Sequence, residues 1–341
     1  MKFDTTLLTN ELKTIPAMTE AAQALGFDGI WTSETAHDPF LPLTLAAEHS
    51  HTLSLGTSIA VAFPRSPAVL AYTAWDLARF SEGRFVLGLG TQVKGHNERR
   101  FSVKWEKPLH KMREVILAMR AFWRCWQSGE KLRFEGEFFR FNLMTPFFNP
   151  GPHDHPHIPI YLAGVNANMC QLAGELCEGL HVHPFHTVNY LKELVLPNVQ
   201  RGLEQRGRAR QDIALCSTVF VVPTDDPQMA TAYELNVRQQ IAFYASTPSY
   251  RVVFETHGWG EVAARLSALA SAGKWNDMPA LITDEIMDTL AISDRWGQIP
   301  AKVLRRYGGG LLDRVSYYFP FLPGENDAGW RATIAGFKPR A

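Results

Sequence analysis

The chain has 341 residues, of which 46% are hydrophobic and 20% are charged, and its formal net charge at pH 7 is zero. This balance is that of a folded globular protein and excludes a disordered or fibrous chain. The basic excess with which nucleic-acid-binding proteins attract phosphates is missing, so we expect no nucleic-acid partner.

Strand and helix patterns alternate along the first part of the chain. The strand over 53–63 is almost continuously apolar or small, as expected when both of its faces are covered. Pro16 in the first turn and Gly26 at the end bound the first helix. Strands are expected at 2–8, 28–33, 53–63 and 83–90, and helices at 15–27, 42–51 and 67–81.

The alternation resumes after a looser stretch. A long helix over 108–129 leads into paired aromatic strands within 131–148, which interrupt the main repeat. Further strands are expected at 158–165, 179–185, 213–222 and 314–321, with helices at 166–177 and 188–207 and a helical block from Asp226 to about Arg306.

Eight strands in this order favour the α/β class and a (β/α)8 TIM barrel. One insertion is expected after the fourth strand, at about 129–157, and a helical one after the seventh strand, at about 226–306. Since no linker divides the chain, we interpret 1–341 as a single barrel domain. Active sites of such barrels lie at the carboxyl ends of the strands, so these ends supply the candidate residues.

The loop after the second strand, "SETAHDPF", brings Glu34, His37 and Asp38 close together in sequence. Carboxylates and an imidazole at this spacing can hold a substrate proton or shift one another's pKa, as general acid and base catalysis requires. Asp38 before Pro39 is also a common helix start, so we expect a structural role for it. Glu34 and His37 remain as catalytic candidates.

The third and fourth strands end in small residues. The third, in "GTSIAVAFPRSP", stops at Pro64 and leaves Arg65 at the rim. The fourth is followed by "GLGTQVKGHNERRF", which lacks the last glycine of a dinucleotide fingerprint because Val93 takes its place, and no helix is expected to begin there. Gly90 instead lets a flat ligand approach the backbone. His96 lies on the following loop, where ligand contact and plain surface are both open.

The fifth strand passes directly into a helix at "AGVNANM". Free backbone N–H groups and the positive end of the helix dipole would attract a phosphate there. A plain N-cap role for Asn166 is the alternative.

Histidines in "HDHPH" (153–157) and "HVHPFH" (181–186) raise a metal-dependent barrel hydrolase as a lesser alternative. The first group lies in a proline-rich loop, and the seventh and eighth strands end without Asp or His to complete a metal cage. We therefore expect no metal site.

Three segments together resemble the bacterial luciferase-like superfamily of flavin and deazaflavin oxidoreductases. They are "TSETAHDPFLPLTLAAEHS", "LGTSIAVAFPRSPAVLAYTAWDLARFSEGRFVLGLGTQV" and "YLAGVNANMCQLAGELCEGLHVHPF". The resemblance extends from about Phe3 to Phe321 and is closest to the subgroup that depends on the deazaflavin coenzyme F420. It implies a barrel that holds an isoalloxazine ring at the carboxyl ends of its strands.

The resemblance also implies the cofactor-binding residues. A non-prolyl cis peptide between Ser58 and Ile59 would press against the central ring. The residues implied to lie along the ring are Gly90, Thr91, Gln92 and His96, and the phosphate side of the tail is implied to lie against Ala163, Gly164, Val165, Asn166 and the loop after His183.

The chain departs from the superfamily at two positions. Some members place a catalytic histidine directly after the acidic residue that ends the second strand, but here Thr35 follows Glu34, and the nearest histidine is His37. Others carry a glutamate where this chain has Val93. The catalytic candidates are therefore Glu34, His37 and His96, and proton transfer by Glu34 or by the substrate itself is left open.

Two chemistries follow from the resemblance. With F420 the protein would transfer a hydride between the reduced cofactor and a small organic substrate, and this is the expected function on subgroup resemblance. With FMN the reduced ring would react with oxygen, which makes a monooxygenase. A barrel that binds flavin without turnover is a third possibility.

Partners and compartment complete the expectations. The aromatic insertion and the helical block would cap the pocket, which indicates an apolar substrate. The resemblance implies a homodimer, for which Trp123 and Trp126 would suit either a dimer face or a helix packed on its own barrel. The N-terminal sequence lacks a signal-peptide apolar region, no run of about 18 apolar residues occurs, and the four cysteines show no CxxC spacing. We expect a cytoplasmic protein with free thiols and no membrane association.

Overall fold

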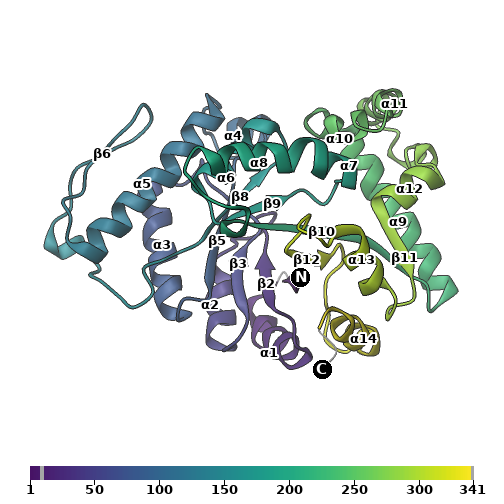
Figure 1. Cartoon of the computed structure of the whole chain (residues 1–341), viewed down its shortest axis with the longest axis horizontal. Helices are drawn as coiled ribbons and strands as arrows, with labels where there is room; N and C mark the ends of the chain where they lie inside the picture. Colours follow the sequence, from purple (N-terminus) through teal and green to yellow (C-terminus); the bar gives the residue numbers. More distant parts are fainter. Residues whose placement is uncertain (8–10, 339–341) are drawn as a thin grey trace.

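Short apolar strands pair in parallel to form the centre of the molecule, which is seen here in a computed structural model that describes residues 1–7 and 11–338 (Figure 1). Within these residues a ring closes in the order β1, β2, β3, β5, β8, β9, β10 and β12, and β12 pairs again with β1. The bounds of these strands are Lys2–Leu7, Gly29–Thr32, Ser54–Thr57, Phe85–Gly90, Ile160–Gly164, Gly179–Val182, Ala214–Pro223 and Arg314–Tyr317. The ring confirms the predicted (β/α)8 TIM barrel; Leu8, which we expected in the first strand, lies outside the described residues.

Helices follow the strands and cover the outside of the ring (Figure 1). Proline stands in the first turn of several, as in α3 and α5, where its missing N–H would have no helical partner. No helix in the described part of the chain combines the length and hydropathy needed to cross a membrane. The helices are α1 Ile15–Leu25, α2 Leu41–Glu48, α3 Pro67–Phe80, α4 Lys94–Arg99, α5 Pro108–Ser128, α6 Ala167–Leu176, α7 Val188–Tyr190, α8 Leu196–Glu204, α9 Pro227–Ser246, α10 Arg251–Glu255, α11 Gly260–Ser271, α12 Asp284–Leu290, α13 Ile299–Tyr307 and α14 Asp327–Phe337.

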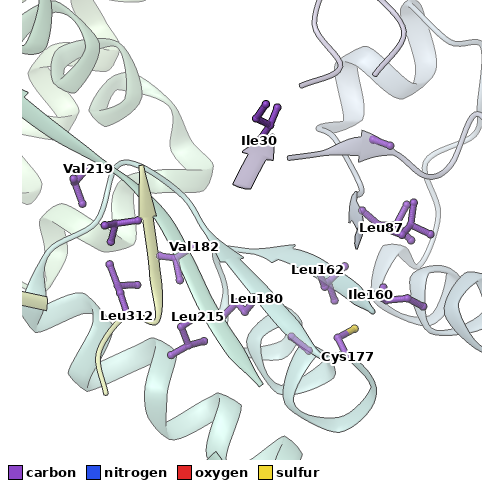
Figure 2. Close-up of a cluster of buried hydrophobic side chains, with 14 of the residues drawn as sticks. Ile30, Leu87, Ile160, Leu162, Cys177, Leu180, Val182, Leu215, Val219 and Leu312 are labelled. Atoms are coloured by element: carbon purple, nitrogen blue, oxygen red, sulfur yellow. The ribbon is translucent and has the colours of Figure 1, made fainter. Parts of the chain in front are cut away.

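The aliphatic core lies between the outer faces of the strands and the helices (Figure 2). Successive side chains of a strand point to opposite faces, so Leu180 and Val182 on β9 point outward while His181 points into the barrel. Leu162 on β8 and Leu215 on β10 belong to the same outer core and are fully buried. Aliphatic side chains therefore pack outside the ring, and the side chains that point into it are mainly aromatic, polar or charged.

Large side chains inside the barrel face glycines on neighbouring strands. Trp31 on β2 lies edge-on to His181 on β9, with ring centroids 5.0 Å apart. A Cβ atom on Gly56 would lie 2.3 Å from the Trp31 ring, and one on Gly179 would lie 2.3 Å from the Tyr161 ring. These two glycines make the space that the aromatic rings occupy.

A buried ion pair inside the barrel joins the first strand to the last. Nε and Nη2 of Arg314 on β12 donate to the two carboxylate oxygens of Asp4 on β1, at 2.8 and 2.7 Å. The indole N–H of Trp31 donates to the same carboxylate at 2.9 Å. Because the side chains of Arg314 and Asp4 are only 7% and 2% exposed, each charge depends on the other rather than on water.

Both predicted insertions are present. Residues 129–157 contain the antiparallel pair β6 (Phe134–Glu135) and β7 (Arg140–Phe141), which extends away from the barrel on one side (Figure 1). The segment between β10 and β12, called here the helical insertion, carries α9 to α13. It also contains β11 (Ala291–Asp294), which pairs in parallel with the end of β10. The sequence predicts only helices there, because a strand of four residues carries too short a pattern to stand out.

Trp123 and Trp126 do not form an exposed dimer face. Nε1 of Trp123 donates to the carbonyl oxygen of Ala71 on α3 at 3.1 Å, and the Trp126 ring lies 5.5 Å from that of Trp75. Both tryptophans are buried because α5 packs on α3. The expectation of a helix packed on its own barrel is therefore the correct one for this pair.

Replacing Asp4 by asparagine is expected to lower the free energy of unfolding by about 3–5 kcal/mol, because the Arg314 guanidinium would stay buried without its counter-charge. Urea unfolding measures the change. The matched control is Glu255→Gln, which breaks the half-exposed pair between Arg251 and Glu255 and should cost less than about 1 kcal/mol. Equal effects of the two substitutions would show that the ion pair does not hold the barrel closed.

Candidate functional site

Alternation along the strands decides which residues line the mouth of the barrel, meaning the carboxyl ends of its strands. Because His181 points inside, His183 two residues later points to the same side. The same two-residue spacing holds on three other strands. Gly90 points inward like Gly88, Ala163 like Tyr161, and Tyr318 like Ser316. Small residues thus end β5 and β8, while larger polar and aromatic residues follow β9 and β12.

Three predicted cofactor-binding residues converge at the mouth. A Cβ atom on Gly90 would lie 2.6 Å from Cδ1 of Ile59 and 3.5 Å from Cβ of Ala163. The side chain of Ile59 therefore lies directly over the bare backbone of Gly90 and beside Ala163. These three residues, called here the floor, form a low apolar surface against which a flat group can lie.

The third barrel strand is interrupted at Ser58 and Ile59, between β3 and its continuation β4 (Ala60–Val61), and the peptide bond between these two residues is cis, as the resemblance implies. A side chain replaces the regular pairing on the β5 side of this break. Oγ1 of Thr57 donates to the carbonyl oxygen of Gly88 at 2.6 Å and accepts its N–H at 2.9 Å. The Thr57 hydroxyl thus holds the strand just before the break.

Glu34 holds the β2 side of the same break. Its N–H donates to the carbonyl oxygen of Ile59 at 3.2 Å, and its Oε2 accepts from the N–H of Val61 at 2.7 Å and from Nη1 of Arg65 at 2.6 Å. The side chain of Glu34 is only 8% exposed. The carboxylate is therefore fixed as an acceptor, and Arg65, which we expected at the rim, is its ion-pair partner.

Asp38 has the structural role expected of it. Its Oδ1 accepts the N–H groups of the two residues at the start of α2, at 2.8 and 3.2 Å. Its Oδ2 also accepts from Nη2 of Arg65 at 3.2 Å. Asp38 therefore starts α2 and extends the ion pair between Arg65 and Glu34.

His37 and His96 lie on exposed segments that meet at the mouth. His96 is on the short helix α4, where the sequence analysis expected a loop; a helix of six residues without a capping side chain leaves no periodic signal. Arg100 at the end of α4 donates to the carbonyl oxygen of Thr35, which joins the two segments. In the described part of the chain neither imidazole forms a hydrogen bond with the Glu34 carboxylate.

Thr91 and Gln92 form the turn between β5 and α4. Gln92 has a φ of 58°, and its Oε1 accepts the N–H of Val93 at 3.0 Å. Nδ2 of Asn97 donates to the carbonyl oxygen of Thr91 at 2.8 Å. Both predicted residues are half-buried, and their own side chains and α4 fix the turn next to Gly90.

Helix α6 starts directly after β8, and Asn166 is its N-cap, because Oδ1 accepts the N–H of Met169 at 3.0 Å. A cavity of about 290 Å³ lies against this helix start. The other N–H groups of the first turn have no partner within the helix, so the cavity suits an anionic group. Its lining residues are Pro108, Leu109, Asn166, Ala167, Asn168 and Met169. The preceding Gly164 and Val165 lead into it from β8.

The helical insertion encloses His183. The imidazole stacks on the Tyr250 ring with centroids 4.1 Å apart and meets the Tyr244 ring edge-on at 4.6 Å. Its Nδ1 accepts the N–H of Phe185 at 3.1 Å. His183 directly follows β9, which neighbours β8 in the ring, so it lies at the mouth next to the Ala163 side of the floor, with its ring held in one orientation.

A chain of hydroxyl groups continues from this aromatic contact. The hydroxyl oxygens of Tyr244 and Tyr318 are 2.5 Å apart, and Tyr318 donates to Oε1 of Gln240 at 3.2 Å. Neither tyrosine is among the site residues predicted from the sequence. Only the folded chain brings the residue after β12 against α9, and no spacing within α9 singles out Tyr244.

Burial keeps three histidines on and after β9 neutral. Loss of solvation lowers the pKa of His181 and of His183 to about 3 and that of His186 to about 4. Nδ1 of His186 lies 2.9 Å from the carbonyl oxygen of His183 and 3.2 Å from Oγ of Ser217. All three rings are therefore uncharged near neutral pH.

Neither histidine-rich segment gathers into a metal site. Across residues 1–7 and 11–338, no group of three or more His, Cys, Asp or Glu side chains is placed to hold a metal ion. His181 lies among aromatic rings inside the barrel, and His183 lies among those of the helical insertion. In the other segment, His153 packs on Trp75 with ring centroids 4.0 Å apart.

Known proteins resemble the chain along most of its length. A family model described as luciferase-like monooxygenase matches residues 1–313. An uncharacterized protein of Mycobacterium tuberculosis (strain ATCC 25618 / H37Rv) is 44% identical over 309 residues, which cover 90% of each chain. A 5,10-methylenetetrahydromethanopterin reductase of Archaeoglobus fulgidus is 30% identical over 279 residues, which cover 80% of this chain and 79% of that protein. The structure of a coenzyme F420 dependent tetrahydromethanopterin reductase from Methanopyrus kandleri superposes with a TM-score of 0.78 at 20% identity and covers 98% of this chain and 97% of that one.

Acid is expected to destabilise the protein through the three neutral histidines. Their pKa values of about 3 to 4 when folded lie below about 6.5 when unfolded, so between these values the unfolded chain binds more protons. The free energy of unfolding should therefore fall as the pH falls from about 6.5 to about 4, by up to about 1.4 kcal/mol per pH unit for each histidine.

Urea unfolding at several pH values measures this slope. His186→Asn should reduce the slope by about one proton, since one titrating group is removed. Substitution of the exposed His157 by glutamine should leave it unchanged. A slope that is the same in His186→Asn as in the natural protein would contradict the assignment.

Proposed function

The chain belongs to the luciferase-like monooxygenase family, and we propose that within it the protein transfers a hydride between reduced coenzyme F420 and a small organic substrate. The observation that carries the proposal is the floor, where Ile59, Gly90 and Ala163 from three different strands come together. The relative from Archaeoglobus fulgidus supports hydride transfer rather than oxygenation, because it is named as a reductase, and a deazaflavin supplies a hydride without oxygen.

The residues at the mouth fit a ring cofactor with a phosphate tail. The bare backbone of Gly90 lets the Ile59 side chain lie low over it, where a Cβ would come within 2.6 Å of Cδ1, and the turn after Gly90 is held by other side chains. We assign Ser58, Ile59, Gly90, Thr91 and Gln92 to the ring. To the phosphate side of the tail we assign the start of α6 with its cavity and the segments leading to it, which are Ala163, Gly164, Val165, Asn166 and the loop after His183.

The chain's own residues position the ring and supply a proton. Glu34 acts as a positioning residue, since its carboxylate and its N–H hold Val61 and Ile59 on the far side of the break. His37 and His96 are exposed at the mouth and are the proposed carriers of the proton that accompanies the hydride. When bound, the cofactor would supply the hydride.

An FMN-dependent monooxygenase is the second candidate. The family description names a monooxygenase, and the floor and the α6 cavity would take the ring and phosphate of FMN in the same way. The two candidates differ in whether oxygen is consumed.

The substrate and the assembly are part of the proposal. Aromatic side chains such as Phe220 and Tyr318, with ring centroids 4.7 Å apart, support an apolar substrate. Exposed Leu143, Phe147 and Phe148 on the insertion after α5 support a homodimer. The four cysteines are free and buried, which supports a cytoplasmic location.

Equilibrium titration of the protein with F420 and FMN, each oxidised and reduced, is expected to show tighter binding of F420. Gly90→Ala should weaken F420 binding by about tenfold or more, which is about 1.4 kcal/mol, because the new Cβ would push Ile59 into the space above the floor. The matched control is Gly297→Ala, whose Cβ would meet Ala332 at an ordinary 3.8 Å. Tighter binding of reduced FMN with oxygen consumption would establish the second candidate, and binding of neither cofactor would overturn both.

Glutamine substitutions are expected to separate the proposed catalytic roles. If His37 or His96 carries the proton, its replacement should lower kcat by about 100-fold and leave F420 affinity unchanged. Glu34→Gln should instead lower both kcat and cofactor affinity, because it removes the negative charge that pairs with Arg65 and holds the break in the third strand. Steady-state kinetics and titration measure both quantities, with His157→Gln as the control. Unchanged kcat in both histidine variants would mean that the proton comes from another group.

A further inference from the structure

His183 presents one hydrogen-bond donor in a fixed direction at the mouth. Its Nδ1 accepts the N–H of Phe185 at 3.1 Å, so that nitrogen carries no proton and the neutral ring carries its proton on Nε2. Among the described residues no acceptor lies within hydrogen-bond distance of Nε2. The ring is only half-buried, so this N–H is open to a ligand.

The surroundings keep this donor neutral and oriented. Tyr250 stacks on one face of the imidazole at 4.1 Å, and Tyr244 meets it at 4.6 Å. Burial lowers the pKa of His183 to about 3, so the ring carries no charge near neutral pH. A neutral imidazole N–H can polarise a substrate oxygen without giving up its proton.

Two of the neighbouring hydroxyl groups, those of Tyr244 and Tyr318, are already used. Tyr318 gives its proton to Oε1 of Gln240, so in the short contact between the two tyrosines it is Tyr244 that donates to Tyr318. Within the described residues this leaves Nε2–H of His183 and the hydroxyl of Tyr250 as donors without an acceptor in an otherwise aromatic wall. A ligand held against this wall and the floor beside it needs an apolar body and one acceptor oxygen.

We propose that Nε2–H of His183 donates a hydrogen bond to the oxygen of a carbonyl group in the substrate, which makes the substrate class an apolar ketone or aldehyde. The proposal rests on the proposed function, because the floor beside His183 is the assigned place of the cofactor ring. The proton stays on His183. Its hydrogen bond draws electron density from the carbonyl carbon and turns that carbon toward the floor.

The test uses the full-length protein with 15N-labelled histidine, observed by NMR at neutral pH. The His183 signals are assigned by their loss in His183→Gln. Cyclohexanone and methylenecyclohexane, which share a shape and differ in the oxygen, are added to the protein alone and to the protein with oxidised F420, which has no hydride to give. We expect the Nε2–H form of His183, a shift of its Nε2 signal with the ketone only, and about tenfold tighter binding of the ketone.

Variants separate hydrogen bonding from a structural role. His183→Phe should abolish the preference for the ketone, His183→Gln should retain part of it because its amide can donate, and the exposed His157→Gln should retain all of it. A proton on Nδ1, no ketone-dependent shift up to the solubility limit, or an unchanged preference in His183→Phe would overturn the proposal. Failure to bind F420 with an intact ketone shift would overturn the proposed function and leave the role of His183 standing.

Discussion

A closed ring of strands gives every side chain only two directions, into the barrel or out toward the helices, and the rest of this structure depends on that constraint. On β9 it turns Leu180 and Val182 outward into the aliphatic core and His181 and His183 inward. Inward side chains must share a narrow space, so a large residue on one strand requires a small one on the next, as with Trp31 and Gly56. At the mouth the same rule produces an uneven rim, in which the floor is followed around the ring by the aromatic wall at His183.

The break in the third strand is held by side chains that replace regular strand pairing on both sides. Thr57 bonds to both backbone groups of Gly88, and Glu34 bonds to the backbone of Ile59 and Val61. A backbone without a regular partner would be costly to bury, so these contacts let the chain leave the sheet where the floor is formed. The acidic residue that the sequence marks as a catalytic candidate is therefore part of the framework.

Features that repeat along the chain could be predicted from the sequence, and features that depend on contact between distant segments could not. The alternation of strands and helices predicts the barrel, and the direct passage of β8 into α6 predicts the N-cap at Asn166. The helix α4 and the strand β11 are too short to leave a periodic pattern. The pairing of Arg65 with Glu34 joins two loops, and the contact of Tyr250 with His183 joins an insertion to a strand end, so no local spacing reveals either.

The ion pair between the first and the last strand also limits when the barrel can close during synthesis. Asp4 and Arg314 are 310 positions apart, so the carboxylate leaves the ribosome long before its partner exists. Until the last strand is synthesised, β1 has one open edge and an uncompensated inward charge. The ring can therefore close only after β12 has emerged, and until then the half-built sheet has to be kept from pairing with other chains.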